Sequence, residues 1–175
     1  MILDLFQLTG RTALVTGARR GLGQGIAVGL AEAGADIACV SRSGNADTTR
    51  ERVEAAGQRF LDIQVDLADP ESRVGLVDRV NEELGPVDIL VNNAGGGGRE
   101  PAETFPMEIW RRQLEVHLTA SFDLSQQAAD GMLERGRGKI INIGSVMTFQ
   151  GGVDIPAYAA AKHAIAGMTL SLIHI

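Results

Sequence analysis

The sequence predicts an α/β fold in which a parallel sheet is covered by helices on both faces. Two observations support this: short apolar or β-branched runs recur along the chain, and amphipathic stretches alternate strictly with them. Strict alternation implies right-handed crossovers, so we expect a doubly wound sheet with strand order 3-2-1-4-5. The expected strands, all interpreted as buried on both faces, are residues 12–17, 36–41, 60–67, 87–95 and 139–145.

The helices between these strands have recognisable start and stop residues. Glycines end the first three helices, because a left-handed residue closes the last helical turn. Prolines open the third and fourth, since proline fits the first turn. The expected helices are residues 22–34, 47–57, 70–85 and 106–136, with a last one near Tyr158.

Length and composition limit the possible classes of protein. The 175 residues fit one domain without a linker. A net charge of −6 argues against a nucleic-acid or membrane partner, since such partners need a concentrated basic face. The single cysteine, Cys39, excludes an internal disulfide. Residues 1–17 resemble neither a signal peptide nor a membrane span, so we expect a cytoplasmic protein.

A glycine-rich turn, TGARRGLGQG, follows the first strand and leads into the first helix. Gly17, Gly21 and Gly23 would let the backbone approach a pyrophosphate, which then lies on the free N–H groups of the helix. Such turns also end strands in many other proteins. The position between a strand and a helix nevertheless predicts nucleotide binding.

The only tyrosine, Tyr158, lies four residues before Lys162 in IPAYAAAKHAIAG, a segment made mostly of small apolar residues. Positions i and i+4 share one face of a helix, so the two side chains point the same way. A phenol is a poor acid or base at neutral pH, and a nearby ammonium stabilises its phenolate form. The pattern therefore indicates acid–base chemistry, with an ordinary helix-surface contact as the alternative.

Three motifs together resemble the short-chain dehydrogenase/reductase family. They are TG-x-x-x-G-x-G at residues 16–23, NNAG at residues 92–95, and Tyr158-x-x-x-Lys162. They occur in the family's order, and the resemblance extends to about Thr169. It implies that residues 1–169 form an NAD(P)-binding Rossmann domain of an oxidoreductase that acts on CH–OH groups.

The resemblance implies roles for three catalytic residues. Tyr158 exchanges the proton with the substrate alcohol or carbonyl, and Ser145 bonds the substrate oxygen. Lys162 stabilises the phenolate and binds the nicotinamide ribose. Ser145 ends the expected fifth strand, thirteen positions before Tyr158, as in the family. The cofactor carries the hydride, and we expect no metal site.

The resemblance also implies which residues bind the cofactor. An acidic residue after the second strand would favour NAD and repel a 2′-phosphate, but the segment CVSRS has none. Serine and arginine there can bind the phosphate, so we predict NADP. The alternative cofactor is NAD, in which case the arginines would be loop residues that carry their charge in solvent. The expected cofactor-binding residues are Thr16, Gly17, Arg20, Gly21, Leu22, Gly23, Ser41, Arg42, Asp66, Leu67, Asn93, Ala94, Gly95, Tyr158 and Lys162.

One residue departs from the family's pattern. His117 stands where the family usually has an asparagine that helps to hold a water for proton exchange by the lysine. Histidine can both donate and accept a hydrogen bond, so one possibility is that the proton relay to the lysine survives, with an added titration near neutral pH. The alternative is that the relay is lost. His163 has a different helical phase from Lys162, and we expect it on the surface.

Three further segments resemble the sugar-acid branch of the family, which includes 2-deoxy-D-gluconate 3-dehydrogenase and gluconate 5-dehydrogenase. They are residues 1–11, 100–106 and 149–152. The resemblance implies an aldonate or its keto-acid as the small-molecule substrate, with Arg99 either its cationic partner or a plain loop arginine. A 3-oxoacyl reductase shares the main motifs and is the alternative enzyme. The family favours homotetramers.

The C-terminal segment differs from the family, whose members continue through a sixth strand, a substrate loop and a seventh strand. The last six residues, LSLIHI, back-translate to CTGTCTCTTATACACATC, the end of a transposon-based sequencing adapter. We hypothesise that Leu170 to Ile175 are adapter read-through and that the gene continues from about Thr169. As written, the chain could be an inactive nucleotide-binding fragment, which is the alternative to an enzyme.

Overall fold

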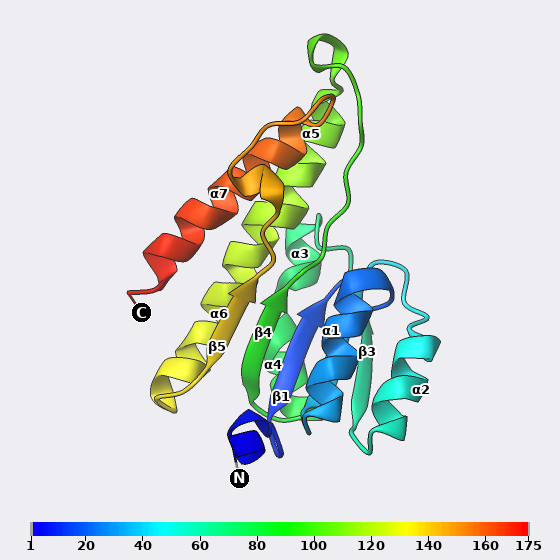
Figure 1. Cartoon of the computed structure of the whole chain (residues 1–175), viewed down its shortest axis with the longest axis vertical. Helices are drawn as coiled ribbons and strands as arrows, with labels where there is room; N and C mark the ends of the chain where they lie inside the picture. The colour runs from blue at the N-terminus through cyan, green and yellow to red at the C-terminus, as the bar shows by residue number, and fades with distance from the viewer. Residues whose placement is uncertain (1, 175) are drawn as a thin grey trace.

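The computed structural model describes residues 2–174, so Ile175 of the hypothesised read-through segment lies outside the described residues. The fold prediction is confirmed: five parallel strands form one sheet in the order β3-β2-β1-β4-β5 (Figure 1). In Figure 1 the arrowheads of β1, β4 and β5 point to the same edge of the sheet. The strands are β1 (Thr12–Thr16), β2 (Asp36–Ser41), β3 (Phe60–Gln64), β4 (Val87–Asn92) and β5 (Lys139–Asn142).

Helices alternate with the strands as expected. A long helix is assembled from α5, the π-helical segment η3 and α6, and in Figure 1 it extends beyond the carboxyl edge of the sheet. Within residues 2–174, no helix combines the length and apolar character needed to cross a membrane. The helical elements are η1 (Ile2–Phe6), α1 (Gly21–Glu32), α2 (Asp47–Ala55), α3 (Pro70–Arg73), α4 (Leu76–Glu83), η2 (Ala102–Thr104), α5 (Met107–Leu114), η3 (Glu115–Thr119), α6 (Ala120–Glu134), η4 (Val146–Thr148) and α7 (Pro156–Leu172).

The core lies in two layers, one on each face of the sheet. Alternate strand residues point to opposite faces, so Ala13 and Val15 of β1 pack towards α1 and α2, whereas Leu14 packs towards α4 and α6. β1, β2 and β4 are almost wholly buried. These three central strands therefore form the rigid support for the loops at the carboxyl edge.

The prediction that every strand is buried on both faces is wrong for β3 and β5. In β3 only Ile63 is fully buried, and β5 alternates between exposed and partly buried residues, with Ile141 43% exposed. Both are edge strands with one hydrogen-bonded neighbour among the described residues. An apolar run in the sequence does not distinguish a central strand from an edge strand.

The prediction of one helix over residues 70–85 is also wrong. The segment divides into α3 and α4 at Val74, which is extended, and Gly75, which has φ of 66°. Glycine adopts this left-handed conformation without steric cost and is unfavourable inside a helix. Asp69 caps α3, since its side chain accepts a hydrogen bond from the backbone N–H of Glu71.

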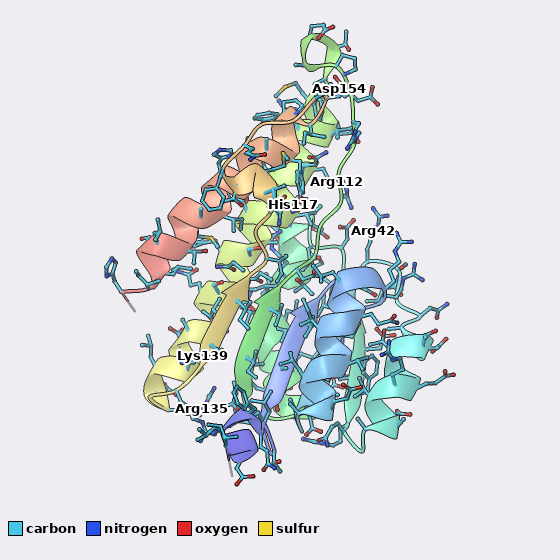
Figure 2. The ribbon with its side chains drawn as sticks, viewed as in Figure 1. Arg42, Arg112, His117, Arg135, Lys139 and Asp154 are labelled. Atoms are coloured by element: carbon cyan, nitrogen blue, oxygen red, sulfur yellow. The ribbon has the colours of Figure 1, made fainter. Side chains whose placement is uncertain are left out.

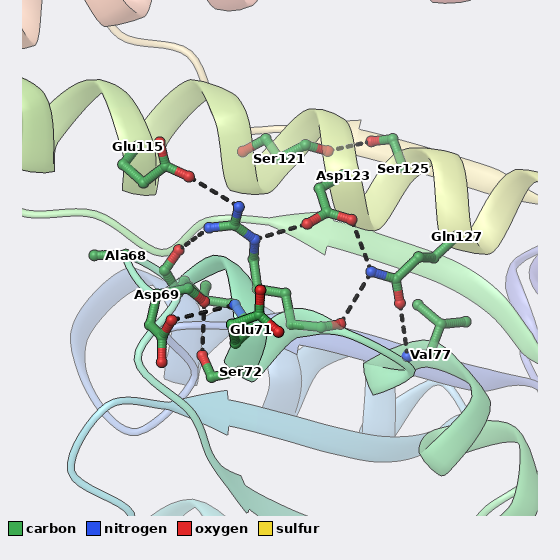
Figure 3. A network of polar contacts seen from close by, with 12 residues as sticks. Ala68, Asp69, Glu71, Ser72, Val77, Glu115, Ser121, Asp123, Ser125 and Gln127 are labelled. Carbon is green, nitrogen blue, oxygen red and sulfur yellow. Dashed lines mark hydrogen bonds and ion pairs between the residues drawn. The ribbon is translucent and has the colours of Figure 1, made fainter.

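The short helix α3 places a buried arginine between two acidic residues of the long helix. Arg73, 3% exposed, donates to Glu115 at 2.8 Å and to Asp123 at 2.7 Å. Gln127 extends this network by bonding Asp123 and the backbone of Arg73 (Figure 3). Arg73 also donates to the carbonyl of Leu67 at 2.5 Å. The network therefore connects the loop after β3 to the π-helical segment.

Candidate active site

The glycine turn after β1 packs tightly against the loop after β4. A Cβ atom at Gly23 would lie 2.4 Å from both the Asn93 side chain and the carbonyl oxygen of Gly17, so no larger residue fits. Gly17 and Gly21 have positive φ angles of 70° and 61°. Arg20, at the N-cap of α1, makes no side-chain capping bond. The N–H groups at the start of α1 therefore remain available to an anion.

Thr16 and Asn93 bond each other. The Thr16 hydroxyl accepts hydrogen bonds from the backbone N–H groups of Asn93 and Ala94, at 3.0 and 2.9 Å. The Asn93 amide donates to the carbonyl of Thr16 at 2.9 Å. Both predicted cofactor-binding side chains therefore hold the ends of β1 and β4 together.

A cavity of about 490 Å³ lies over the carboxyl edge of the sheet. The predicted residues Gly21, Leu22, Gly23, Thr16, Asn93, Tyr158 and Lys162 are not part of its wall, and Leu22 is 63% exposed. Eight other predicted cofactor-binding residues do line it: Gly17, Arg20, Ser41, Arg42, Asp66, Leu67, Ala94 and Gly95.

Positively charged side chains from the glycine turn and from the residue after β2 line this cavity. Arg42 lies just beyond the carboxyl end of β2 (Figure 2), and Arg20 and Arg19 line the same wall. Ser41 is 8% exposed, and its buried hydroxyl has no partner within residues 2–174. Sequence reasoning missed Arg19, although it is next to Arg20 in the glycine turn. This part of the cavity can bind a phosphorylated ligand.

Asp66 also lines the cavity and pairs with Arg112 of α5. It follows β3, which ends at Gln64 rather than at Leu67 as predicted. The Arg112 guanidinium donates to both carboxylate oxygens, at 3.0 and 2.9 Å. Burial alone would raise the pKa of Asp66, but the bonds from Ala68 N–H and from Arg112 outweigh it and lower that pKa.

Four residues of the long helix that sequence reasoning did not select also line the cavity. Their spacing of i, i+3, i+4 and i+7 places them on one helical face, which was a usable signal in the sequence. They are Ile109, Arg112, Gln113 and Val116.

The Tyr158 and Lys162 pair lies on α7, which packs against α5, η3 and η4. The Lys162 ammonium is 5.7 Å from the centroid of the Tyr158 ring and donates to the carbonyl of Ile143 at 2.5 Å. Lys162 is 5% exposed, and this burial lowers its pKa. His163 is exposed, as predicted.

Ser145 lies beyond the end of β5, which stops at Asn142 and not at Ser145 as predicted. It caps the 3-10 turn η4: its hydroxyl accepts from Met147 N–H at 3.1 Å, and its own N–H donates to the Thr148 hydroxyl at 3.0 Å. The serine hydroxyl proton is thus not used in this cap. The contact of η4 with α7 brings Ser145 to the same side of the protein as Tyr158.

His117 is buried in the π-helical segment, beside Tyr158. Its Nε2 lies 3.0 Å from the carbonyl oxygen of Gly96, and its Nδ1 is buried without a partner in the described part of the chain. A Cβ atom at Gly95 would lie 2.1 Å from the imidazole. Burial lowers the pKa of His117, the bond to Gly96 opposes this, and the charge of Lys162 lowers it further. His117 therefore joins residues 94–98, the cavity loop, to the tyrosine and lysine of α7.

The comparisons with known proteins agree with these features. A 2-dehydro-3-deoxy-D-gluconate 5-dehydrogenase of Bacillus subtilis is 49% identical over 170 residues, which are 96% of this chain and 66% of that protein. A crystal structure of a gluconate 5-dehydrogenase from Burkholderia cenocepacia, in complex with NADP and tartrate, is 38% identical with a TM-score of 0.89. It is matched over 98% of this chain and 68% of its own.

A short-chain type dehydrogenase/reductase from Mycobacterium marinum superimposes with a TM-score of 0.92 at 32% identity, over 98% of this chain and 69% of its own. The chain thus spans about two thirds of the length of these relatives. A sequence profile for short chain dehydrogenases matches residues 11–174. With the glycine turn, the parallel sheet and the tyrosine and lysine of α7 in place, the chain belongs to the short-chain dehydrogenase family.

Proposed function

We propose that the full-length protein is an NADP-dependent oxidoreductase that interconverts a secondary alcohol and a ketone on a sugar acid. The observation that carries this proposal is the Lys162 ammonium, buried within 5.7 Å of the ring of the only tyrosine, Tyr158. A buried ammonium stabilises a neighbouring phenolate more strongly than one in water does. This pair lies at the same edge of the sheet as the nucleotide-sized cavity.

The cavity fits NADP by the chemistry of its walls. Glycines allow close approach of the pyrophosphate, and the N–H groups at the start of α1 are free to bind it. Arg20 and Arg42 supply cations for a 2′-phosphate, and the Ser41 hydroxyl supplies an unused donor. No carboxylate ends β2, which removes the group that would repel this phosphate. The bound cofactor would supply the hydride as NADPH or accept it as NADP⁺.

The chain's own residues supply the proton and hold the substrate. Tyr158 exchanges the proton with the substrate oxygen, and the Lys162 ammonium places a positive charge near its ring. Ser145 donates its hydroxyl proton to the same oxygen, since the η4 cap uses that hydroxyl only as an acceptor. His117, in contact with both Tyr158 and the cavity loop, replaces the usual asparagine next to the lysine.

An aldonate or its keto-acid is the proposed substrate. Support comes from the relatives that are named for gluconate and for 2-dehydro-3-deoxy-D-gluconate. Arg99, exposed in the loop after β4, is the proposed cationic partner of the substrate carboxylate. Glu100 N–H donates to the carbonyl of Asp154, so this loop lies against the loop that carries Phe149 to Gly152.

Arg42→Asp in the full-length protein tests the proposed cofactor. The dissociation constants of NADPH and NADH should move in opposite directions, because the carboxylate repels the 2′-phosphate and accepts from ribose hydroxyls. Arg52→Asp, an exposed change on α2, is the matched control and should alter neither constant. An unchanged ratio of the two constants in Arg42→Asp would contradict the assigned phosphate site.

A further inference from the structure

Gln113 is a buried polar residue without a partner at the wall of the cofactor cavity. It is 5% exposed, and neither its amide nitrogen nor its amide oxygen has a hydrogen-bond partner among residues 2–174. Burying an unpaired amide costs stability, so such a group indicates a ligand that completes its bonds. The proposed function leaves this amide without a role.

The neighbours of Gln113 give this part of the cavity its shape. Ile109 and Val116 lie one turn away on each side of it and offer apolar surface. Gly98 faces it across the cavity loop, and a Cβ atom there would lie 3.8 Å from the Gln113 amide nitrogen. The loop therefore presents a residue without a side chain to the amide.

The charged neighbours already have partners. Both Asp66 carboxylate oxygens accept from Arg112, and one also accepts from Ala68 N–H. Gln113 thus offers an unused donor and an unused acceptor on one planar group, next to apolar walls. A purine base presents the complementary pair, a ring nitrogen that accepts and an exocyclic amine that donates, on a flat apolar ring.

We propose that Gln113 binds the adenine base of the nucleotide through both atoms of its side-chain amide. The inference rests on the proposed function, since the same cavity holds the nucleotide. The base and the 2′-phosphate are carried by one ribose, so a 2′-phosphate held by Arg42 places the base in the same cavity, near Asp66 and Gln113.

Gln113→Met tests this assignment in the full-length protein. The variant replaces an unpaired amide with an apolar chain of similar length, so the ligand-free protein should melt at the same temperature or higher. Titrations with NADPH and with 2′,5′-ADP, which carries the base but no nicotinamide, should each show roughly tenfold weaker binding. Nicotinamide mononucleotide lacks the base and should bind unchanged.

Gln127→Met is the matched control. Gln127 is a glutamine of the same long helix whose amide bonds Asp123, Arg73 and Val77. This variant should lose thermal stability and keep its nucleotide affinities, the reverse of Gln113→Met. A Gln113→Met protein that melts lower and binds 2′,5′-ADP normally would overturn the assignment, as would equal weakening of all three ligands. A wild-type protein that binds neither NADPH nor 2′,5′-ADP would overturn the proposed function as well.

Discussion

The imidazole of His117 meets the phenol ring of Tyr158 edge-on, with the ring centroids 5.3 Å apart and the ring planes at 80°. The same imidazole lies against the backbone of Gly95 and Gly96. One side chain from the π-helical segment thus contacts both the nucleotide cavity loop and the proposed catalytic tyrosine.

His117 should make the protein less stable in acid. Because the pKa of folded His117 lies below its ordinary value of 6.5, the unfolded chain takes up a proton first as the pH falls. The free energy of unfolding should therefore decrease below about pH 6.5, by up to about 1.4 kcal/mol per pH unit from this group. Urea titrations from pH 7 to pH 5 should show a shallower loss in His117→Asn.

The exposed His163 provides the control for this pH dependence. His163→Asn should follow the wild-type stability curve throughout this range. If the free energy of unfolding fell equally with pH in His117→Asn and in the wild type, His117 would not be the buried, neutral histidine described above.

Gly95→Ala should destabilise the protein by about 1–3 kcal/mol, because the new methyl group overlaps the His117 ring. His117→Ala in the same protein should recover part of that loss, as a double-mutant cycle of denaturant midpoints would measure. Gly97→Ala, where no described atom lies within 4 Å of the new Cβ, is the control. Additive effects of the Gly95 and His117 changes would exclude the contact.

Arg73→Met should cost about 3–5 kcal/mol of unfolding free energy, since it leaves the acidic residues Glu115 and Asp123 without their buried partner. Arg79→Met breaks an exposed i, i+4 pair with Glu83 and should cost less than about 0.5 kcal/mol. Chemical denaturation of both variants measures the difference. Equal losses would mean that the buried network contributes no more than a surface pair.

Cys39 should not react with thiol reagents in the native protein. It is fully buried in β2, and burial, with the nearby charge of Asp62, raises its pKa to about 12. Labelling by iodoacetamide at pH 8 should begin only in denaturant, at the same concentration as the unfolding transition measured by circular dichroism. Rapid labelling without denaturant would place Cys39 outside the core.

Local signals in the sequence were enough to predict the sheet order, the glycine turn and the positions of Tyr158 and Lys162 on one helix. These local signals did not predict features that depend on tertiary contacts. Gly75 lies inside the helix predicted over residues 70–85, but the helix breaks there, and Arg73 at the end of α3 reaches its acidic partners. The edge position of β5 depends on which strands pair with it, and its apolar run carries no such information.

The site was predicted at the level of motifs and less well at the level of individual contacts. Thr16 and Asn93 belong to the predicted motifs, yet each side chain bonds the backbone of the other residue, which joins the ends of β1 and β4. The sequence spacing puts Arg112 and Gln113 on one face of the helix, but it does not show what that face lies against. Their place at the cavity depends on how the long helix lies against the loop after β3.

Tyr158→Phe in the full-length protein tests the central proposal most directly. NADPH consumption with a keto-aldonate, followed by absorbance, should fall at least about a hundredfold because the phenyl ring cannot exchange the substrate proton. NADPH affinity should stay unchanged, since the cavity walls do not include Tyr158. Turnover by Tyr158→Phe at a rate close to that of the wild type would contradict the account.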